Sequence, residues 1–430
     1  MPHSRRSFLA ASLALPALGA GRGEPPEAYA GRRQGLAEAV GRGVIALLGH
    51  DEFAGRSGFT GFRQESNFYY LTGRSEPGAA LLLAPARGRH PYREVLFLPR
   101  RGPLAEKWSG PSLSPDAARG LGFEESLDRD RFRDELRTLL RDRKRLYGLL
   151  PPGLGREGRE SLEQLRDEAG TQDVRDVRAD LARMRSVKAP GELALLQEAV
   201  RATESAYRAA WAVVRAGASE RSVAAEFVAA AFRAGCERLA FPPMAGSGAN
   251  AAVLHYQRND SVMRSGELLL MDAGAECSRY AADMARTVPV KGRFDPEQRR
   301  LYEVVLGARD AVVAAARPGV TLGGPAPGSL LSVAERSMRS RAPRGVSTRL
   351  PHALGHHVGL DVHDPAPFRA PLRKGMVIAI EPGIYLPEQG VGIRVEDMIE
   401  ITDDGCRVMS AGLPVEADAI ESALASGGAP

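Results

Sequence analysis

The sequence lacks the features that mark membrane-spanning and nucleic-acid-binding proteins. No internal segment of the 430 residues approaches the roughly 20 uninterrupted apolar residues that a membrane-spanning helix needs, so we expect no stable membrane insertion. Lysine is scarce, and despite a formal net charge of +5 the basic residues are scattered singly and balanced locally by Asp and Glu. No basic stripe with interleaved aromatic residues occurs, which argues against a nucleic-acid partner.

Cysteine is also rare: only Cys236, Cys277 and Cys406 occur, far apart in the sequence. Their number is odd, and the short paired spacings of structural zinc sites and redox motifs are missing. We therefore expect three buried side chains that act as small apolar groups, without a disulfide framework. Cys277 follows Asp272 by five residues, so a location of its side chain near a functional site remains an alternative.

The N-terminal segment, residues 1–30, resembles a twin-arginine export signal. Ser4-Arg5-Arg6-Ser7-Phe8-Leu9 leads directly into an apolar stretch that ends at Ala20. We expect the signal to be removed after Ala20 or, in the phrase Ala28-Tyr29-Ala30, after Ala30. Because twin-arginine export moves folded proteins, the resemblance implies a periplasmic or otherwise exported protein that folds in the cytoplasm.

The remaining chain is long enough for two domains. Short apolar runs separated by turns predict an α/β domain over residues 31–181, with strands over 79–84 and 94–98 and a helix over 132–140. Pro190 at a helix start marks a second domain over residues 187–424. Residues 425–430 have nothing to bury and are expected to be disordered.

The second domain shows the periodicity of both helices and strands, so the expected fold class is α/β (α+β). Helices are expected over 193–214, 222–234 and 296–316, and strands over 267–271, 281–290, 377–380 and 393–401. The strands over 267–271 and 281–290 would pair antiparallel. One register of this pair points Asp272 and Asp283 into the same space.

Five residues of the second domain lie in local phrases that suit metal ligands. They are Asp272 in Met-Asp-Ala-Gly, Asp283 in Ala-Asp-Met-Ala-Arg-Thr, His356 in Gly-His-His, Glu381 in Glu-Pro-Gly and Glu396 in Arg-Val-Glu-Asp. Four carboxylates and one imidazole form a hard, oxygen-rich set that favours Mn²⁺ or a similar divalent ion. Two such ions held by bridging carboxylates would share a hydroxide, which attacks carbonyl groups.

The histidine cluster around His356 needs a separate explanation. His352 and His356 imitate the zinc-protease phrase H-E-x-x-H, but position 353 is Ala where the general base is required, and Gly355 disfavours the helix. That interpretation therefore fails. His357 is expected to be a bystander, while Arg286 and Thr287, three and four positions after Asp283, are expected to hydrogen-bond to the groups around the ligands.

The five phrases together resemble the pita-bread metallopeptidases, the fold of methionine aminopeptidase, aminopeptidase P, prolidase and the metal-free creatinase. The resemblance implies that Asp272 chelates one metal ion, that Asp283 and Glu396 bridge two ions, and that His356 and Glu381 hold the other. It implies two divalent ions, Mn²⁺ first, with Zn²⁺ or Co²⁺ as alternatives. Glu381 would also move the proton between water and the leaving nitrogen.

The first domain separates the branches of this family. Residues 62–73, Phe-Arg-Gln-Glu-Ser-Asn-Phe-Tyr-Tyr-Leu-Thr-Gly, resemble the N-terminal domain of aminopeptidase P, which methionine aminopeptidases lack. The phrase around Trp108 is similar to the family segment whose Trp reaches the active site of a neighbouring subunit. This likeness implies a homo-oligomer, a dimer or a tetramer, in which Trp108 lines the pocket for the first residue of the substrate.

The same resemblance implies roles for residues that read the substrate. His255 and His363 would contact the peptide and stabilise developing charge, His352 would line the proline pocket, and Arg394 would order the carboxylates. We therefore predict an exported Xaa-Pro aminopeptidase that acts on proline-containing peptides. A prolidase restricted to dipeptides remains as an alternative, because no phrase between Asp364 and Gly375 fixes peptide length. A metal-free peptide-binding module on this fold is the second alternative, and the intact set of ligands argues against it.

Overall fold

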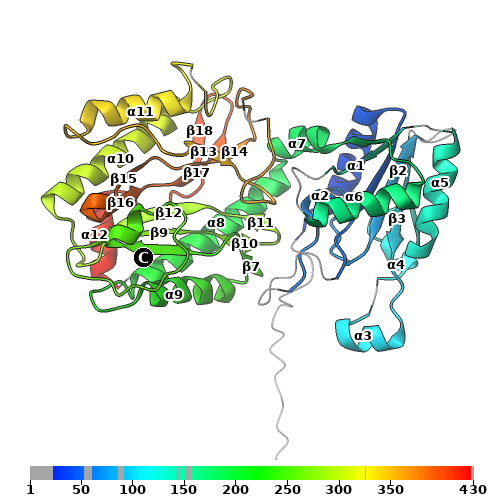
Figure 1. Ribbon diagram of the computed structural model, residues 1–430, viewed down its shortest axis with the longest axis horizontal. Helices are drawn as coiled ribbons and strands as arrows, with labels where there is room; N and C mark the ends of the chain where they lie inside the picture. Colours follow the sequence, from blue (N-terminus) through cyan, green and yellow to red (C-terminus); the bar gives the residue numbers. More distant parts are fainter. Residues whose placement is uncertain are drawn as a thin grey trace, which may run out of the picture.

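The computed structural model describes residues 23–52, 61–85, 92–111, 113–142, 145–150, 156–324, 326–367 and 369–427. They form two α/β domains that lie side by side, the first in blue and cyan and the second in green to red (Figure 1). Within these ranges no helix is both long and apolar enough to cross a lipid bilayer. The arginine pair and the apolar stretch of the expected export signal lie outside the described residues.

The first domain is built on a six-stranded sheet of order β4-β3-β2-β1-β5-β6. Because side chains alternate along a strand, Ile45 and Leu47 of β1 face the core shared with α1, while Val44 and Ala46 face α5 and α6. Its elements are α1 Pro26–Val40, β1 Val44–Leu48, α2 Ser66–Thr72, β2 Ala80–Pro85, β3 Tyr92–Leu98, α3 Pro103–Ser109, α4 Pro115–Arg119, β4 Glu125–Asp128, α5 Phe132–Asp142, β5 Leu146–Gly148, α6 Arg156–Ala169 and β6 Val174–Asp176.

Helix α1 begins inside the segment assigned to the export signal. Pro26 opens the helix at its first position, where the missing backbone N–H costs nothing. Tyr29 and Arg33 of this helix are buried, and Arg33 pairs with Glu94 of β3 at 2.6 Å. The folded part of the chain therefore starts before Gly31, and Ala30 lies within a packed helix.

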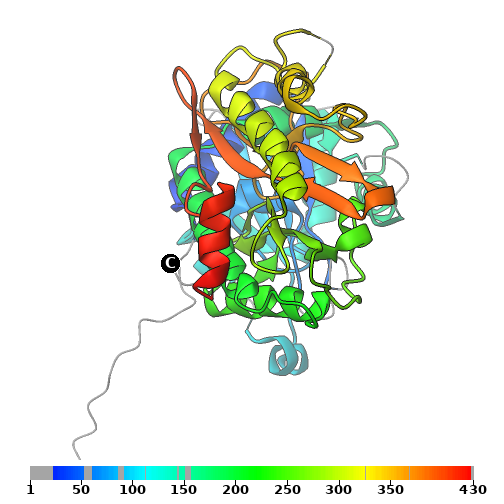
Figure 2. The same cartoon turned by 90° about the vertical axis from the view of Figure 1, so that its left-hand side faces the viewer.

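The second domain follows a connecting helix, α7 Arg178–Ser186, and places pairs of helices on opposite sides of its strands. Helices α8 and α9 lie on one side and α10 and α11 on the other (Figures 1 and 2). Its helices are α8 Pro190–Trp211, α9 Glu220–Arg233, η2 Gly248–Ala252, α10 Pro296–Ala315, α11 Leu330–Arg341, η3 Pro387–Gln389 and α12 Ala417–Ala425. As predicted, Pro190 starts α8 and Pro296 starts α10.

The strands of this domain form small antiparallel groups between the helices. The orders are β12-β9-β8, β13-β14-β17-β18, β11-β10-β7 and β15-β16. Their bounds are β7 Arg238–Leu239, β8 Met244–Ser247, β9 Leu268–Ala273, β10 Ala275–Cys277, β11 Tyr280–Ala281, β12 Met284–Pro289, β13 Gly355–His357, β14 Val377–Ile380, β15 Gly383–Leu386, β16 Val391–Arg394, β17 Asp397–Ile401 and β18 Cys406–Val408. The β9/β12 pair confirms the predicted antiparallel pairing.

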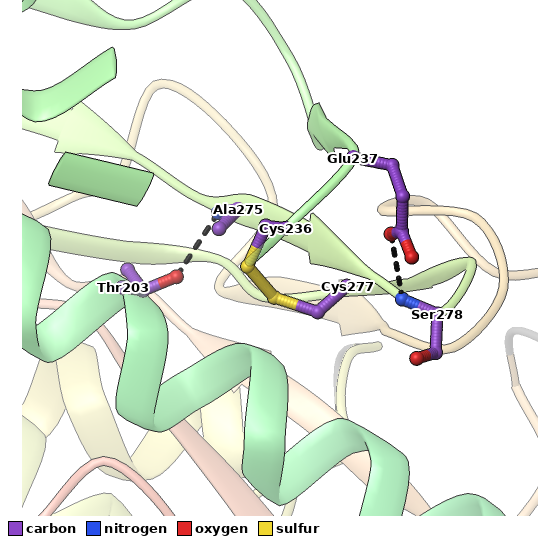
Figure 3. Close-up of a disulfide and its surroundings, with 6 residues drawn as sticks. All are labelled: Thr203, Cys236, Glu237, Ala275, Cys277 and Ser278. Carbon is purple, nitrogen blue, oxygen red and sulfur yellow. Dashed lines mark hydrogen bonds between the residues drawn. A yellow bond between two sulfur atoms is a disulfide. The ribbon is translucent and has the colours of Figure 1, made fainter. Parts of the chain in front are cut away.

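The described chain runs slightly past the expected domain end at residue 424, since Ala425 belongs to α12 and residues 426 and 427 follow it as a turn. The expectation that the cysteines form no disulfide is wrong. Cys236 and Cys277 form a disulfide, with Cα atoms 4.3 Å apart (Figure 3). The sequence does not show this contact, because the two cysteines are 41 residues apart. They meet because β7, which follows α9, pairs with β10. Cys406 is free and half-buried.

Candidate metal centre and active site

The β9/β12 pair brings Asp272 and Asp283 together. Asp272 is paired with Ala285 in the antiparallel register, and Asp283 directly precedes β12. The chains approach closely at Gly274, where an added Cβ would lie 1.7 Å from the carbonyl oxygen of Ala282. Both Asp side chains are buried, and one oxygen of each lies within 4.8 Å of a Glu396 carboxylate oxygen.

His356 and Glu381 come from the neighbouring β13/β14 pair. His356 lies in a strand opposite Ala379, not in a helix, which confirms that the zinc-protease interpretation fails. Gly355 is required here, because a Cβ would lie 1.9 Å from the Ala379 carbonyl oxygen. Glu381 follows β14 and donates its backbone N–H to the Leu354 carbonyl at 2.8 Å. The two side chains thus reach the same space from adjacent strands.

Glu396 corrects the continuous strand predicted over residues 393–401. β16 ends at Arg394, which pairs with Gly383, and β17 starts at Asp397, which pairs with Ile380. Between them Glu396 donates its backbone N–H to the Ala285 carbonyl at 2.9 Å. The chain changes partners at this point, and the change places the Glu396 carboxylate beside Asp283.

The buried carboxylates outnumber the counter-charges that the described residues supply. Asp272 Oδ1 and Glu396 Oε2 are buried and have no hydrogen-bond partner there. Burial is the largest cause that raises the pKa of Asp272, to about 7 although Arg394 lowers it, and burial with the nearby Asp283 carboxylate raises the pKa of Glu396 well above its usual range. Unpaired buried charge is strongly unfavourable, so this cluster fits divalent cations, which would supply the missing partners.

The candidate ligand groups overlap as a two-ion site requires. Ligand atoms within 4.8 Å of one another occur in three sets: Asp272, Asp283 and Glu396; His356, Glu381 and Glu396; and Asp283, His356 and His363. Asp283, His356 and Glu396 each belong to two sets. The structure therefore brings together all five predicted ligands, with His363 beside them.

Arg394 organises one edge of the centre. Its guanidinium hydrogen-bonds to Asp272, donates to the Tyr385 hydroxyl at 2.8 Å and faces the Leu254 carbonyl at 3.5 Å. Tyr385 also lies 3.0 Å from His352 Nε2. Sequence reasoning missed Tyr385, whose only signal was its position four residues after Glu381. Arg394 is thus placed to order the carboxylates through its contact with Asp272. Its side chain is buried and does not face solvent.

The three histidines expected to read substrate differ in burial. His352 is partly buried, with Nδ1 3.6 Å from a Glu381 oxygen, and burial lowers its pKa to about 4. His363 is exposed and its ring centroid lies 4.1 Å from that of His356. His255 is exposed and directly follows Leu254, whose carbonyl faces Arg394. All three therefore lie around the candidate ligands.

Other predicted residues support or lie apart from the centre. Arg286 donates to the Glu396 carbonyl at 2.6 Å and pairs with Asp397 at 2.7 Å, while Thr287 Oγ1 accepts the Arg394 backbone N–H at 3.0 Å. These contacts hold the ligand-bearing backbone. His357 is buried in β13 and is absent from the candidate ligand sets. Trp108 is 84% exposed on α3, which lies on the first domain away from the strands that carry the candidate ligands (Figure 1).

Comparisons with known proteins agree with this geometry. The family model of metallopeptidase family M24 matches residues 194–403, and that of the aminopeptidase P N-terminal domain matches residues 29–147. The Xaa-Pro aminopeptidase of Haemophilus influenzae is 33% identical over 390 residues, covering 84% of this chain and 88% of that protein. The Escherichia coli Xaa-Pro aminopeptidase is 32% identical, covering 91% and 96%.

The solved structure of E. coli aminopeptidase P with the inhibitor Pro-Leu superposes with a TM-score of 0.81. It is 29% identical and covers 94% of this chain and 99% of that chain. The pita-bread fold and the aminopeptidase P-type first domain expected from the sequence are thereby confirmed. The chain therefore belongs to metallopeptidase family M24, in its aminopeptidase P branch.

Proposed function

We propose that this centre removes the residue preceding proline from the N-terminus of peptides, as an Xaa-Pro aminopeptidase. Relatives named for this activity match over most of both chains. The observation that carries the assignment to this site is the buried set of carboxylates with unpartnered oxygens, at Asp272 and Glu396. A metal-free binding module would not retain such a cluster, because each unpaired buried carboxylate destabilises the fold.

Asp272, Asp283, His356, Glu381 and Glu396 would hold two divalent ions. When bound, such a pair lowers the pKa of water and polarises the scissile carbonyl. We propose Mn²⁺, since carboxylate oxygens dominate the set, with Zn²⁺ and Co²⁺ as alternatives. Arg394 holds one oxygen of Asp272 by a charge-assisted hydrogen bond and leaves Oδ1 free for an ion.

Glu381 is placed to move the proton. It lies between His352 and His356, with a carboxylate oxygen 3.6 Å from the first and another 4.0 Å from the second. We propose that it accepts a proton from the attacking water and delivers it to the proline nitrogen that leaves. The imide nitrogen of an Xaa-Pro bond carries no N–H, so the substrate must be recognised by shape and by its carbonyl groups.

The histidines are suited to this recognition. His352 is held by Tyr385 and its lowered pKa keeps the imidazole neutral, so it can form a wall of a proline pocket. His255 and His363 are exposed beside the ligands and can donate hydrogen bonds to substrate carbonyls, which stabilises charge that develops there. These roles predict that each of the three affects turnover more than metal content.

A prolidase shares this chemistry, so the length of the substrate decides between the two activities. The test is hydrolysis of an Xaa-Pro dipeptide and an Xaa-Pro-Xaa tripeptide by the protein loaded with Mn²⁺. We expect the tripeptide to be cleaved after its first residue. Cleavage of the dipeptide alone would identify a prolidase, and cleavage of neither, together with no bindable divalent ion, would identify a binding module.

The ligand assignment is tested by substitution. Asp283→Asn and Glu396→Gln should each abolish metal-dependent hydrolysis and leave the circular dichroism spectrum unchanged, because the fold does not need their charge. Asp403→Asn is the control, since this carboxylate is 78% exposed and pairs only with Lys374 in the described structure. Near-normal activity in either ligand variant would contradict the assignment.

We further propose an exported homo-oligomer. The arginine pair at Arg5 and Arg6 supports twin-arginine export, to the periplasm in a cell that has one. The disulfide fits that destination, because disulfides persist in oxidising compartments. Leu104 and Trp108 lie one turn apart on α3 and are 71% and 84% exposed, which suits a helix that inserts Trp108 into a neighbouring subunit.

A further inference from the structure

The loop that carries His363, residues Gly359–Asp364, is folded around the carboxylate of Asp364. Asp364 donates its backbone N–H to the His357 carbonyl at 2.9 Å, and its Oδ1 accepts the Asp361 backbone N–H at 3.2 Å. Gly359 lies against the same carboxylate, where an added Cβ would be 2.6 Å from Asp364 Oδ2. The shape of this His363 loop therefore depends on where the Asp364 carboxylate is held.

Two buried cations hold that carboxylate. Arg185 of α7 donates to Asp364 Oδ1 at 2.6 Å, and Lys188 lies 3.2 Å from Oδ2. All three side chains are at most 2% exposed. Arg185 also reaches Asp361 at 2.7 Å, so one planar guanidinium joins both aspartates that flank His363.

The first domain holds the loop from the other side. Ser66 donates to Asp361 Oδ1 at 2.7 Å, and Arg63 donates to the Leu360 carbonyl at 2.6 Å and lies 3.4 Å from Asp361. Arg63 is itself fixed by Glu276 of β10 at 3.0 Å. These residues belong to the phrase Phe-Arg-Gln-Glu-Ser-Asn that marks the aminopeptidase P-type domain, so that phrase ends directly on an active-site loop.

His363 has no comparable support of its own. Its imidazole is exposed, it contacts the His356 ring, and no described residue hydrogen-bonds to it. The position of the imidazole is therefore set by the backbone of the loop. A displacement of about 1 Å at a group that contacts substrate can reduce turnover by about 10²-fold.

We propose that Arg63, Ser66 and Arg185 are positioning residues of the active site, which hold Asp361 and Asp364 and thereby fix His363 against the metal centre. This inference rests on the proposed role of His363 in the reaction. If the inference holds, the first domain contributes to turnover by holding the His363 loop through Ser66 and Arg63. A loop held only by the second domain would lose these contacts.

The test is a double-mutant cycle on the Mn²⁺-loaded protein with an Xaa-Pro-Xaa tripeptide. Arg63→Ala and the milder Ser66→Ala should lower kcat by about 10- to 100-fold, with bound metal and melting temperature little changed. Arg93→Ala is the control, since Arg93 is also a partly exposed arginine of the first domain, paired with Glu125 and Glu135. It should leave kcat unchanged.

The cycle then repeats both substitutions in a His363→Ala background. If Arg63 and Ser66 act through His363, their effects vanish there, whereas losses that multiply would overturn the inference. Normal kcat for both variants with His363 present would overturn it as well. Should Arg63→Ala unfold, Ser66→Ala carries the cycle alone.

A second measurement does not require activity. In protein with isotopically labelled histidine, the His363 imidazole resonance, assigned from its loss in His363→Ala, should shift or broaden in Ser66→Ala and stay in place in Arg93→Ala. An unmoved resonance would overturn the inference. Inactivity of the wild-type protein on Xaa-Pro peptides would instead overturn the proposed function, so the two failures are distinct.

Discussion

Reduction of the Cys236–Cys277 disulfide should lower the free energy of unfolding by about 4 kcal/mol. The bridge closes a loop with a sequence separation of 41 residues between the end of α9 and β10 (Figure 3). Loop-closure entropy for a loop of this length corresponds to about 4 kcal/mol at 25 °C. Both cysteines are only 3% exposed, so their side chains stay packed after reduction. The difference in unfolding free energy between the two redox states therefore measures the constraint that the bridge places on the unfolded chain.

The measurement is urea unfolding of oxidised and reduced protein, followed by tryptophan fluorescence. Trp211 is a suitable reporter because it is 1% exposed in α8, within the domain that contains the disulfide. The other tryptophan, Trp108, is exposed and is removed by Trp108→Phe. Cys406→Ala serves as the control, since its thiol is free and its loss should leave the difference between the two redox states unchanged.

A loss below about 1 kcal/mol on reduction would refute the assigned constraint. Mass spectrometry gives an independent check, because the oxidised protein should contain one free thiol out of three cysteines. Three alkylated thiols in protein recovered from an oxidising compartment would refute the bridge itself.

The remaining predictions concern charge, metal and assembly. Burial raises the pKa of Glu220, but hydrogen bonds led by that from Asn250 outweigh it and leave the pKa below 4.5. The Glu220 carboxylate therefore stabilises the fold fully above pH 4.5 and loses this effect as the pH falls through its folded pKa. In urea unfolding, Glu220→Gln should lower the free energy of unfolding by about 2 kcal/mol at pH 7 and by less at pH 3.5. An equal loss at both pH values would contradict this. Chelation should abolish hydrolysis and lower the melting temperature in calorimetry, and Mn²⁺ at about 100 times its Kd should restore about 2.7 kcal/mol; an unchanged melting temperature would argue against the buried ligands. Trp108→Ala should lower kcat/KM without changing metal content; unchanged kinetics would exclude a role for Trp108 in a neighbouring site.

Asp272 and His356 of the candidate metal centre could be predicted from the sequence because a nearby glycine fixes the local backbone of each. Gly274 and Gly355 permit the close backbone approaches that bring Asp272 and His356 into place. Gly355 directly precedes His356 and Gly274 follows Asp272 by two residues, so the local sequence already specifies the backbone geometry at each ligand. Strand β14 likewise matched its prediction over residues 377–380, since a short buried apolar run determines it locally.

Features made by distant contacts were not predictable in this way. The break before Glu396 exists because the chain changes from pairing with β15 to contacting Ala285 and then pairing with β14. An alternating pattern over residues 393–401 carries no sign of that change. The disulfide and the contact of Arg63 with Leu360 join residues 41 and 297 positions apart, where no local pattern can report them.

The candidate metal ligands and the histidines proposed to contact substrate are held by different kinds of local structure. The ligands lie on or directly beside strands, whereas His255 and His363 lie on loops that are each held by a buried carboxylate. Glu220 accepts hydrogen bonds from Ser247 and Tyr256 around the His255 loop, as Asp364 accepts them in the His363 loop. Strand pairing resists displacement more strongly than a single loop contact does, so weakening either carboxylate contact should alter turnover before it alters metal affinity. A substitution at Ser66 that releases metal and slows turnover together would show that the two parts are coupled more tightly than these contacts imply.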